Sequence, residues 1–232
     1  MPSPRRGKPQ AASRSANASS RPPSQRQRPA EARKFYLVRH RVVSNASGFK
    51  LQNGKTLFHG GPPIFVPPDG RRGFRDYPDV PVFISDKRLG RIHWDFEEYC
   101  GYWFISDRMK TVLERLDPEA FAFLKCRVQL PDASDAPVRW FCDVVRVLDA
   151  LDEEKSEIRI KTAKDGSKFY SFLGGFNLIF KEDVVGSHHI FRMKYHGYAV
   201  ICDEQVRLTC KAAELAGPRF EAAWVRPIIH RS

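Results

Sequence analysis

Hydrophobic residues along this chain form short continuous runs, typical of strands, and sets spaced like one face of a helix. A run followed by such a set occurs twice. In the first copy, the apolar run 102–105 is followed by apolar residues spaced like one face of a helix. These residues are Met109, Val112, Leu113 and Leu116. The second copy has the apolar run 198–202, followed at helical spacing by Val206, Cys210 and Ala213. Each copy therefore predicts a strand followed by an amphipathic helix.

Both predicted helices have a start and an end in the sequence. Asp107 and Asp203 stand at the first positions, where a side-chain oxygen can accept a hydrogen bond from the free backbone amides of a helix start. Pro118 and Pro218 end the helices, because proline has no backbone donor and clashes with the preceding turn. The apolar segment 121–124 follows Pro118, and Phe220 follows Pro218. We therefore predict a duplicated strand–helix–strand unit.

The rest of the chain is mostly strand-like. Strands are expected at residues 35–38, 81–84, 138–147, 158–160, 169–172 and 190–193, with a turn at 164–167. Residues 44–79 are rich in glycine, proline, asparagine and aspartate and predict loops and hairpins. Within them, Arg71, Arg72 and Arg75 are expected on a solvated loop, with an anion contact as the alternative. The fold class predicted is α+β, with mixed and antiparallel strands and a few short helices.

The net charge of +12 is unevenly distributed over the 232 residues. Residues 1–30 carry seven arginine and lysine residues and no acidic residue, and they lack aromatic and branched aliphatic side chains. Such a segment cannot offset an ordering cost of about 1–2 kcal/mol per residue. We therefore expect residues 1–34 to be a disordered basic tail and residues 35–232 to be a single domain. The tail is interpreted as a linker or as the product of an upstream start codon.

Cysteine usage and apolar runs bear on the compartment. The five cysteines are scattered, and no CxxC pair or metal-ligand spacing occurs among them. No apolar run approaches the roughly 20 residues that cross a bilayer, and no apolar stretch follows Arg5 and Arg6 as an export signal requires. We expect reduced thiols in a cytoplasmic protein that does not enter a membrane.

The common catalytic motifs do not occur in the sequence. It contains no GxxxxGK[ST], GxGxxG, HExxH or GxSxG pattern. His188 and His189 are adjacent, so on a strand they would point to opposite faces and could not bind one metal together. Glu97 and Glu98 are expected on a surface helix or turn rather than in acid–base catalysis. We predict no catalytic residue, no metal site and no cofactor.

The two capped helices also carry a family resemblance. Residues 103–108, continuing through 112–118 to 121–123, resemble the central motif of a bacterial immunity-protein family, the eleventh (Imm11-type) of the polymorphic-toxin immunity series. Residues 145–152 with Ser156, and residues 190–220, are similar to two further motifs of that family. The resemblance covers about residues 80–224, with 35–79 only loosely alike. Two departures are Cys202, where serine is usual, and the proline after Gly217.

The resemblance implies a function in protein binding. A neighbouring gene would encode a toxin, often one delivered between bacteria by a secretion system. The immunity protein would bind this cognate toxin and cover its active site or a surface it needs. The resemblance implies no enzymatic activity and no cofactor. Tight binding would rest on a few anchor residues in an interface of standard size.

An acidic segment is the candidate contact surface for the toxin. Residues 132–157 carry eight carboxylates against three basic residues, within a basic protein. Its candidate partner-binding residues are Asp149, Asp152, Glu153, Glu154 and Glu157. An acidic patch there could meet a basic face of a nuclease-like toxin and speed the encounter. An ordinary solvated loop is the alternative.

Two other functions compete with toxin neutralisation. A nucleic-acid-associated regulator would use the basic tail, and removal of residues 1–30 would then abolish a strongly salt-dependent binding. An enzyme that reverses a toxin's modification would protect cells at amounts well below one copy per toxin. A protein that acts by occupancy needs at least one copy for each toxin molecule.

Overall fold

The computed structural model describes residues 33–40, 48–54, 72–74, 76–77, 79–85, 94–99 and 101–224. The predictions for the basic tail before residue 33, and for Arg71, Arg75 and Cys100, lie outside these residues. Arg33 stands at the start of the described part. Its guanidinium bonds to the Asp203 carboxylate at 2.7 Å and to the backbone oxygen of Gly186 at 2.7 Å.

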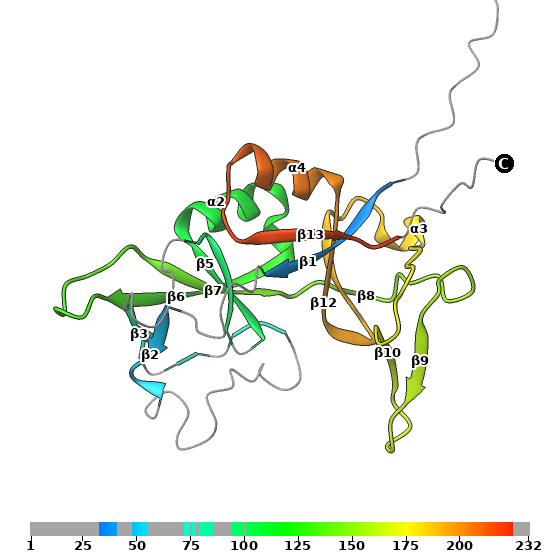
Figure 1. Ribbon diagram of the computed structural model, residues 1–232, viewed down its shortest axis with the longest axis horizontal. Helices are drawn as coiled ribbons and strands as arrows, with labels where there is room; N and C mark the ends of the chain where they lie inside the picture. Colours follow the sequence, from blue (N-terminus) through cyan, green and yellow to red (C-terminus); the bar gives the residue numbers. More distant parts are fainter. Residues whose placement is uncertain are drawn as a thin grey trace, which may run out of the picture. The chain divides into compact units, whose positions relative to one another are not determined.

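Two mixed sheets and a separate hairpin make up the described fold (Figure 1). The first sheet contains, in spatial order, β2 (Phe49–Leu51), β3 (Val82–Ser85), β6 (Phe121–Gln129), β7 (Arg139–Val144), β5 (Tyr102–Ser106) and β4 (Phe96–Tyr99). The second contains β13 (Pro218–Ala222), β1 (Phe35–His40), β12 (His196–Asp203), β11 (Ile190–Met193) and β8 (Val147–Leu148). The hairpin pairs β9 (Arg159–Thr162) with β10 (Lys168–Ser171). All pairs are antiparallel except β3–β6 and β8–β11, so the predicted α+β class is confirmed.

The predicted duplicated unit is confirmed in the topology. The described helices are α2 (Asp107–Leu116), the 3-10 turn η3 (Pro118–Ala120), α3 (Glu182–Val185) and α4 (Glu204–Ala212). In the first sheet, β5, α2 and β6 follow one another, and β7 lies between the two strands, antiparallel to both. In the second sheet, β12, α4 and β13 follow one another, and β1 occupies the equivalent central place. Each unit thus has two parallel strands separated by one antiparallel strand.

Only one of the two predicted helix caps is correct. The Asp203 carboxylate accepts a hydrogen bond from the Val206 amide at 3.2 Å and caps α4 as predicted. The cap of α2 is Ser106, whose hydroxyl accepts from the Met109 amide at 3.1 Å. Asp107 already has helical geometry, and its carboxylate accepts instead from the Trp140 indole at 2.9 Å. The helix begins one residue earlier than the prediction because Ser106 is the last residue with extended backbone.

Most predicted strands are confirmed, with two corrections. The apolar run 138–147 divides into β7 and β8, because the chain leaves the first sheet after Val144 and enters the second at Val147. Glu97 and Glu98 lie on strand β4 and not on a helix or turn. The strand follows from pairing with β5, in which Glu98 stands opposite Trp103. Polar and apolar residues do not alternate in this short segment, because its two carboxylates are adjacent, so the sequence pattern does not predict the strand.

The two units share one hydrophobic core. Helices α2 and α4 contact each other and bury Met109 and Leu113 from one unit against Val206 and Cys210 from the other. Ile105 of β5 and Val200 of β12 also belong to this core, so it joins both sheets. A second cluster lies under the second sheet and a third under the first.

A buried ion pair also connects the two sheets. Asp143 of β7 has no solvent exposure, and the Arg192 guanidinium of β11, 2 % exposed, bonds to it at 2.8 Å. Arg192 also donates to the backbone oxygens of Val144 and Gly197, both at 2.8 Å. Burial lowers the pKa of Arg192, and Asp143 opposes this by stabilising the charged form. Arg72 bonds to Asp143 as well, so the expectation of a solvated loop is wrong for Arg72.

A second link holds β4 against the segment before β13. The Asp95 amide donates to the Ala216 oxygen at 2.8 Å, and the Ala216 amide donates back to the Asp95 carboxylate at 2.8 Å. That carboxylate also accepts from Arg108 and Ser106, both at 2.7 Å. Burial acts to raise the pKa of Asp95, but these hydrogen bonds outweigh it and hold the pKa below its usual value.

Candidate functional site

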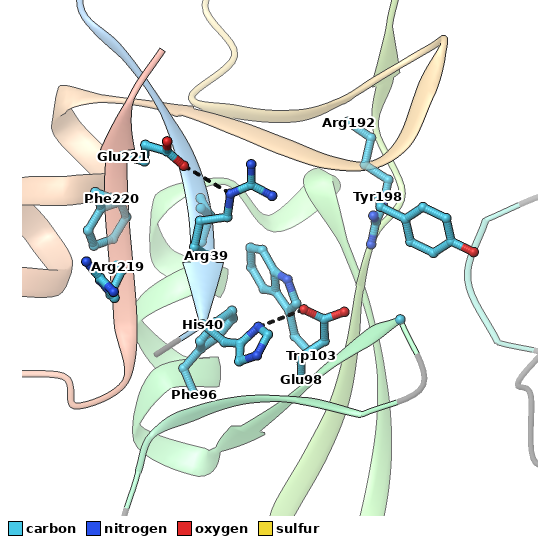
Figure 2. A pocket seen from close by; sticks show the side chains of 12 residues that line it. Arg39, His40, Phe96, Glu98, Trp103, Arg192, Tyr198, Arg219, Phe220 and Glu221 are labelled. Carbon is cyan, nitrogen blue, oxygen red and sulfur yellow. Dashed lines mark hydrogen bonds and ion pairs between the residues drawn. The ribbon is translucent and has the colours of Figure 1, made fainter. Parts of the chain in front are cut away.

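A groove of about 660 Å³ opens where the second sheet meets the edge of the first (Figure 2). We call it the β1–β4 groove, because β1 and β13 line one side and β4 and β5 another, with β12 contributing Tyr198. Its polar and aromatic side chains include Arg39, His40, Glu98, Trp103, Tyr198 and Arg219. These residues lie far apart in the sequence, and the strand order of the two sheets brings them together.

The floor of the β1–β4 groove consists of buried side chains with well-defined contacts. Trp103 of β5 is 6 % exposed and packs edge-on against Phe96 of β4, with ring centroids 5.0 Å apart. Arg192 also lines the groove, and its guanidinium is held by the buried bonds to Asp143 and two backbone oxygens. A ligand that enters the groove therefore meets a preorganised surface, which reduces the entropy lost on binding.

Charged residues on β1 and β13 form one side of the groove. Arg39 and Arg219 stand directly opposite each other in the antiparallel pair, an arrangement in which like charges destabilise a sheet. Glu221 offsets part of this repulsion through a bond of 3.2 Å to the Arg39 guanidinium. Arg219 is exposed and has no ion-pair partner among the residues that the structure describes. His40 bonds to Glu98 at 2.9 Å across the groove, between β1 and β4 (Figure 2).

Tyr198 is the most exposed large apolar side chain of the described residues, at 80 %. Its ring lies against Gly101, 3.4 Å from the position that a β-carbon would occupy there. An exposed aromatic ring that lines a groove together with arginine and tryptophan is typical of protein interfaces, where tyrosine, tryptophan and arginine supply most of the binding energy. The groove thus has the chemistry of a binding site.

The structure places the five predicted acidic residues on one connection after β8, but it pairs three of them. Asp152 bonds to Lys155 at 2.8 Å, Glu153 to Lys168 at 2.5 Å, and Asp149 to Lys194 at 3.5 Å. Hydrogen bonds from Lys168 and from the Tyr170 hydroxyl hold the pKa of Glu153 below its usual value. Glu154 and Glu157 are exposed and have no ion-pair partner in the described part of the chain. The negative charge of this segment is therefore largely balanced by nearby lysines.

The fold buries or hydrogen-bonds His189, Cys126 and Cys210, three described residues of types that can bind metals or act as nucleophiles. His189 bonds through Nδ1 to the Asp203 carboxylate at 2.8 Å. Cys126 and Cys210 are buried, and burial raises the pKa of each thiol to about 12, which keeps both thiols protonated at neutral pH. Across the described ranges, no three histidine, cysteine, aspartate or glutamate side chains gather closely enough to hold a metal ion. Nor does any described helix have the length and apolarity to cross a membrane.

The sequence model of the Immunity protein family (Imm11) matches residues 34–224. The chain belongs to this immunity protein family. The match includes residues 34–79, so the similarity extends further toward the N-terminus than the motifs from residue 80 onward indicate. No curated protein matches the chain.

Motifs in the sequence were sufficient to indicate the immunity family. No motif in the sequence indicated the β1–β4 groove. Tyr198 lies in β12, the strand of the second repeated unit. The pattern of hydrophobic residues along this strand does not indicate that the Tyr198 ring is exposed. Arg39 and Arg219 become neighbours only through the register of β1 and β13. One indication was available: a tyrosine at the polar end of an otherwise buried strand is a candidate surface anchor.

Proposed function

We propose that this chain protects the bacterium that makes it by binding one cognate toxin and covering the toxin's active site or a surface the toxin needs. The family match over residues 34–224 carries this proposal. The toxin is taken to be the product of a neighbouring gene, met in the cytoplasm. Protection then depends on occupancy of the toxin and requires no chemistry from the chain.

The β1–β4 groove supports the proposal as a contact surface. It combines an exposed tyrosine, a nearly buried tryptophan and an arginine without a described ion-pair partner on a preorganised floor. A stable interface buries about 1,600 Å² in total, and a few central anchors of this kind decide its affinity. We propose Tyr198, Arg39 and Arg219 as such anchors.

Co-expression with the product of the adjacent gene tests the function. We expect the full chain to restore growth of cells that make the toxin, and to elute with it as one complex in size-exclusion chromatography. Growth that stays arrested at full expression of both proteins, with separate elution, would contradict the proposal. Rescue without a complex would favour an enzyme that repairs the toxin's damage.

The exposed ring of Tyr198 gives the first specific prediction. Tyr198→Ala should weaken toxin binding by about 2 kcal/mol, or roughly 30-fold, because a truncated central aromatic anchor loses that much. Titration calorimetry measures the loss. Leu208→Ala removes another exposed side chain, on α4 and outside the groove, and should leave the affinity unchanged. Equal affinities for the wild type and Tyr198→Ala would remove the groove from the interface.

The second prediction concerns the proposed contact between the acidic segment and the toxin. Glu154→Lys/Glu157→Lys changes only carboxylates without a described ion-pair partner, so it leaves the bonds of Asp152 and Glu153 to lysine intact. If the segment meets a basic toxin face, the association rate at low salt should fall by about tenfold. Glu119→Lys/Asp183→Lys makes the same charge change at exposed sites elsewhere. Stopped-flow rates that match between the two double variants would exclude the segment as a steering surface.

A further inference from the structure

The β9–β10 hairpin stands apart from the two large sheets. Within the described residues, β9 and β10 form strand ladders only with each other. All four residues of β9, Arg159–Thr162, are exposed. A two-stranded hairpin is marginally stable by itself, so its conformation depends on other contacts.

Contacts at its base and in its turn fix the hairpin. The Tyr170 amide donates to the Tyr195 oxygen at 2.8 Å, and the buried Tyr170 side chain donates from its hydroxyl to Glu153 at 2.5 Å. In the turn, the Ala163 amide donates to the Ser167 oxygen at 2.8 Å, and the Ser167 amide to the Asp165 carboxylate at 2.9 Å. The hairpin therefore has a defined shape before any partner binds, which lowers the entropic cost of binding.

Both faces of the hairpin carry exposed apolar groups. Ile160 is 45 % and Phe169 is 40 % exposed. Ile160 stands opposite Tyr170 and Phe169 opposite Lys161, and since side chains alternate along a strand, Ile160 and Phe169 lie on opposite faces. A flat partner would cover one face and leave the other apolar side chain in water. A cleft can cover both.

The charge of the hairpin is positive. Residues 159–168 contain Arg159, Lys161, Lys164 and Lys168 against one acidic residue, Asp165. Lys168 is paired with Glu153, whereas Lys161 and Lys164 have no ion-pair partner among the described residues. A complementary site would carry carboxylates near the turn and apolar walls further in.

We propose that the β9–β10 hairpin inserts into an acidic, apolar-walled cleft of the toxin, so that this hairpin is the element that occludes it. The inference rests on the proposed function and adds which element enters the toxin and what chemistry receives it. A nucleic acid or an anionic membrane would also attract Lys161 and Lys164. A nucleic acid would leave Ile160 or Phe169 in water. A membrane that took up both apolar side chains would also have to take the charged turn, Lys164 and Asp165, into its hydrocarbon, which is costly. The two apolar faces behind a charged turn therefore favour a protein cleft.

Two double variants of the full chain test the inference against the purified toxin. Ile160→Ser/Phe169→Ser removes the apolar groups, and Lys161→Glu/Lys164→Glu reverses the charge. Each should weaken binding in titration calorimetry by about tenfold or more. Leu208→Ser/Lys211→Glu changes an exposed leucine and a lysine on α4 and should bind like the wild type. Thermal unfolding checks that all three variants remain folded.

The outcomes separate this inference from the proposed function. If the wild type binds the toxin and both hairpin variants bind equally well, the hairpin inference is overturned and the function stands. If the wild type forms no complex, the function and the inference both fail. The same proteins are also mixed with a DNA duplex and with vesicles of equal parts phosphatidylserine and phosphatidylcholine. Binding there that Lys161→Glu/Lys164→Glu abolishes, with toxin affinity unchanged, would overturn the inference in favour of that partner.

Discussion

Replacing Asp143 with alanine is expected to destabilise the protein by about 3–5 kcal/mol, because it leaves the Arg192 guanidinium buried without its counter-ion. Arg192 is 2 % exposed, and its bonds to two backbone oxygens hold it in place. The substitution also removes one of the contacts between the two sheets. Urea unfolding followed by tryptophan fluorescence measures the effect.

Two further variants give the controls for Asp143→Ala. Asp135→Ala removes an exposed carboxylate paired with Arg127 and should cost less than about 1 kcal/mol. Asp143→Ala/Arg192→Met removes both buried charges and should be more stable than Asp143→Ala alone. A cost for Asp143→Ala no greater than that for Asp135→Ala would show that the buried pair does not hold the sheets together.

Substitution of Gly217 by alanine is the second large effect expected. Gly217 has φ +108°, and an added β-carbon would overlap the carbonyl oxygen of Phe96. That oxygen belongs to β4, which the bonds between Asp95 and Ala216 hold against this segment. The clash cannot be relieved without separating β4 from the start of β13, so we expect a loss of about 3 kcal/mol or more.

Gly175→Ala isolates the steric part of that loss. Gly175 has a similar φ of +97°, but no atom lies within 4 Å of its added β-carbon. Its substitution should cost only the backbone strain, about 1–2 kcal/mol. Equal melting temperatures for Gly217→Ala and Gly175→Ala would show that β4 and β13 can move apart freely.

The pattern of hydrophobic residues along the chain predicted the helices and strands well. It did not predict which strands lie next to one another. The helical spacing of Met109 and Leu113 and the proline after α2 were sufficient to predict the first repeated unit. The prediction that Pro218 ends the second helix is wrong, because α4 ends at Ala212 and Pro218 is the first residue of β13. These patterns could not show that β7 and β1 lie inside the two units, because strand order depends on long-range pairing. The cap of α2 was misplaced by one residue, since serine and aspartate at successive positions are both good caps.

The polar sites were harder to predict, because their partners are distant in the sequence. Arg72 looked like a solvated residue in a loop rich in glycine and proline, and its partner Asp143 is 71 residues away. The acidic segment looked unbalanced because Lys168 and Lys194, which pair with Glu153 and Asp149, lie outside it in the sequence. Charge counted along a chain thus overstated the charge presented by the folded surface.

The central claim is that occupancy of the toxin is sufficient for protection. It is tested most directly by titrating a fixed amount of active toxin with the purified full chain and following the toxin's own activity. We predict that activity falls in proportion to added protein and is abolished at one molar equivalent. Complete inhibition well below one equivalent, or full activity at a large excess, would contradict the account.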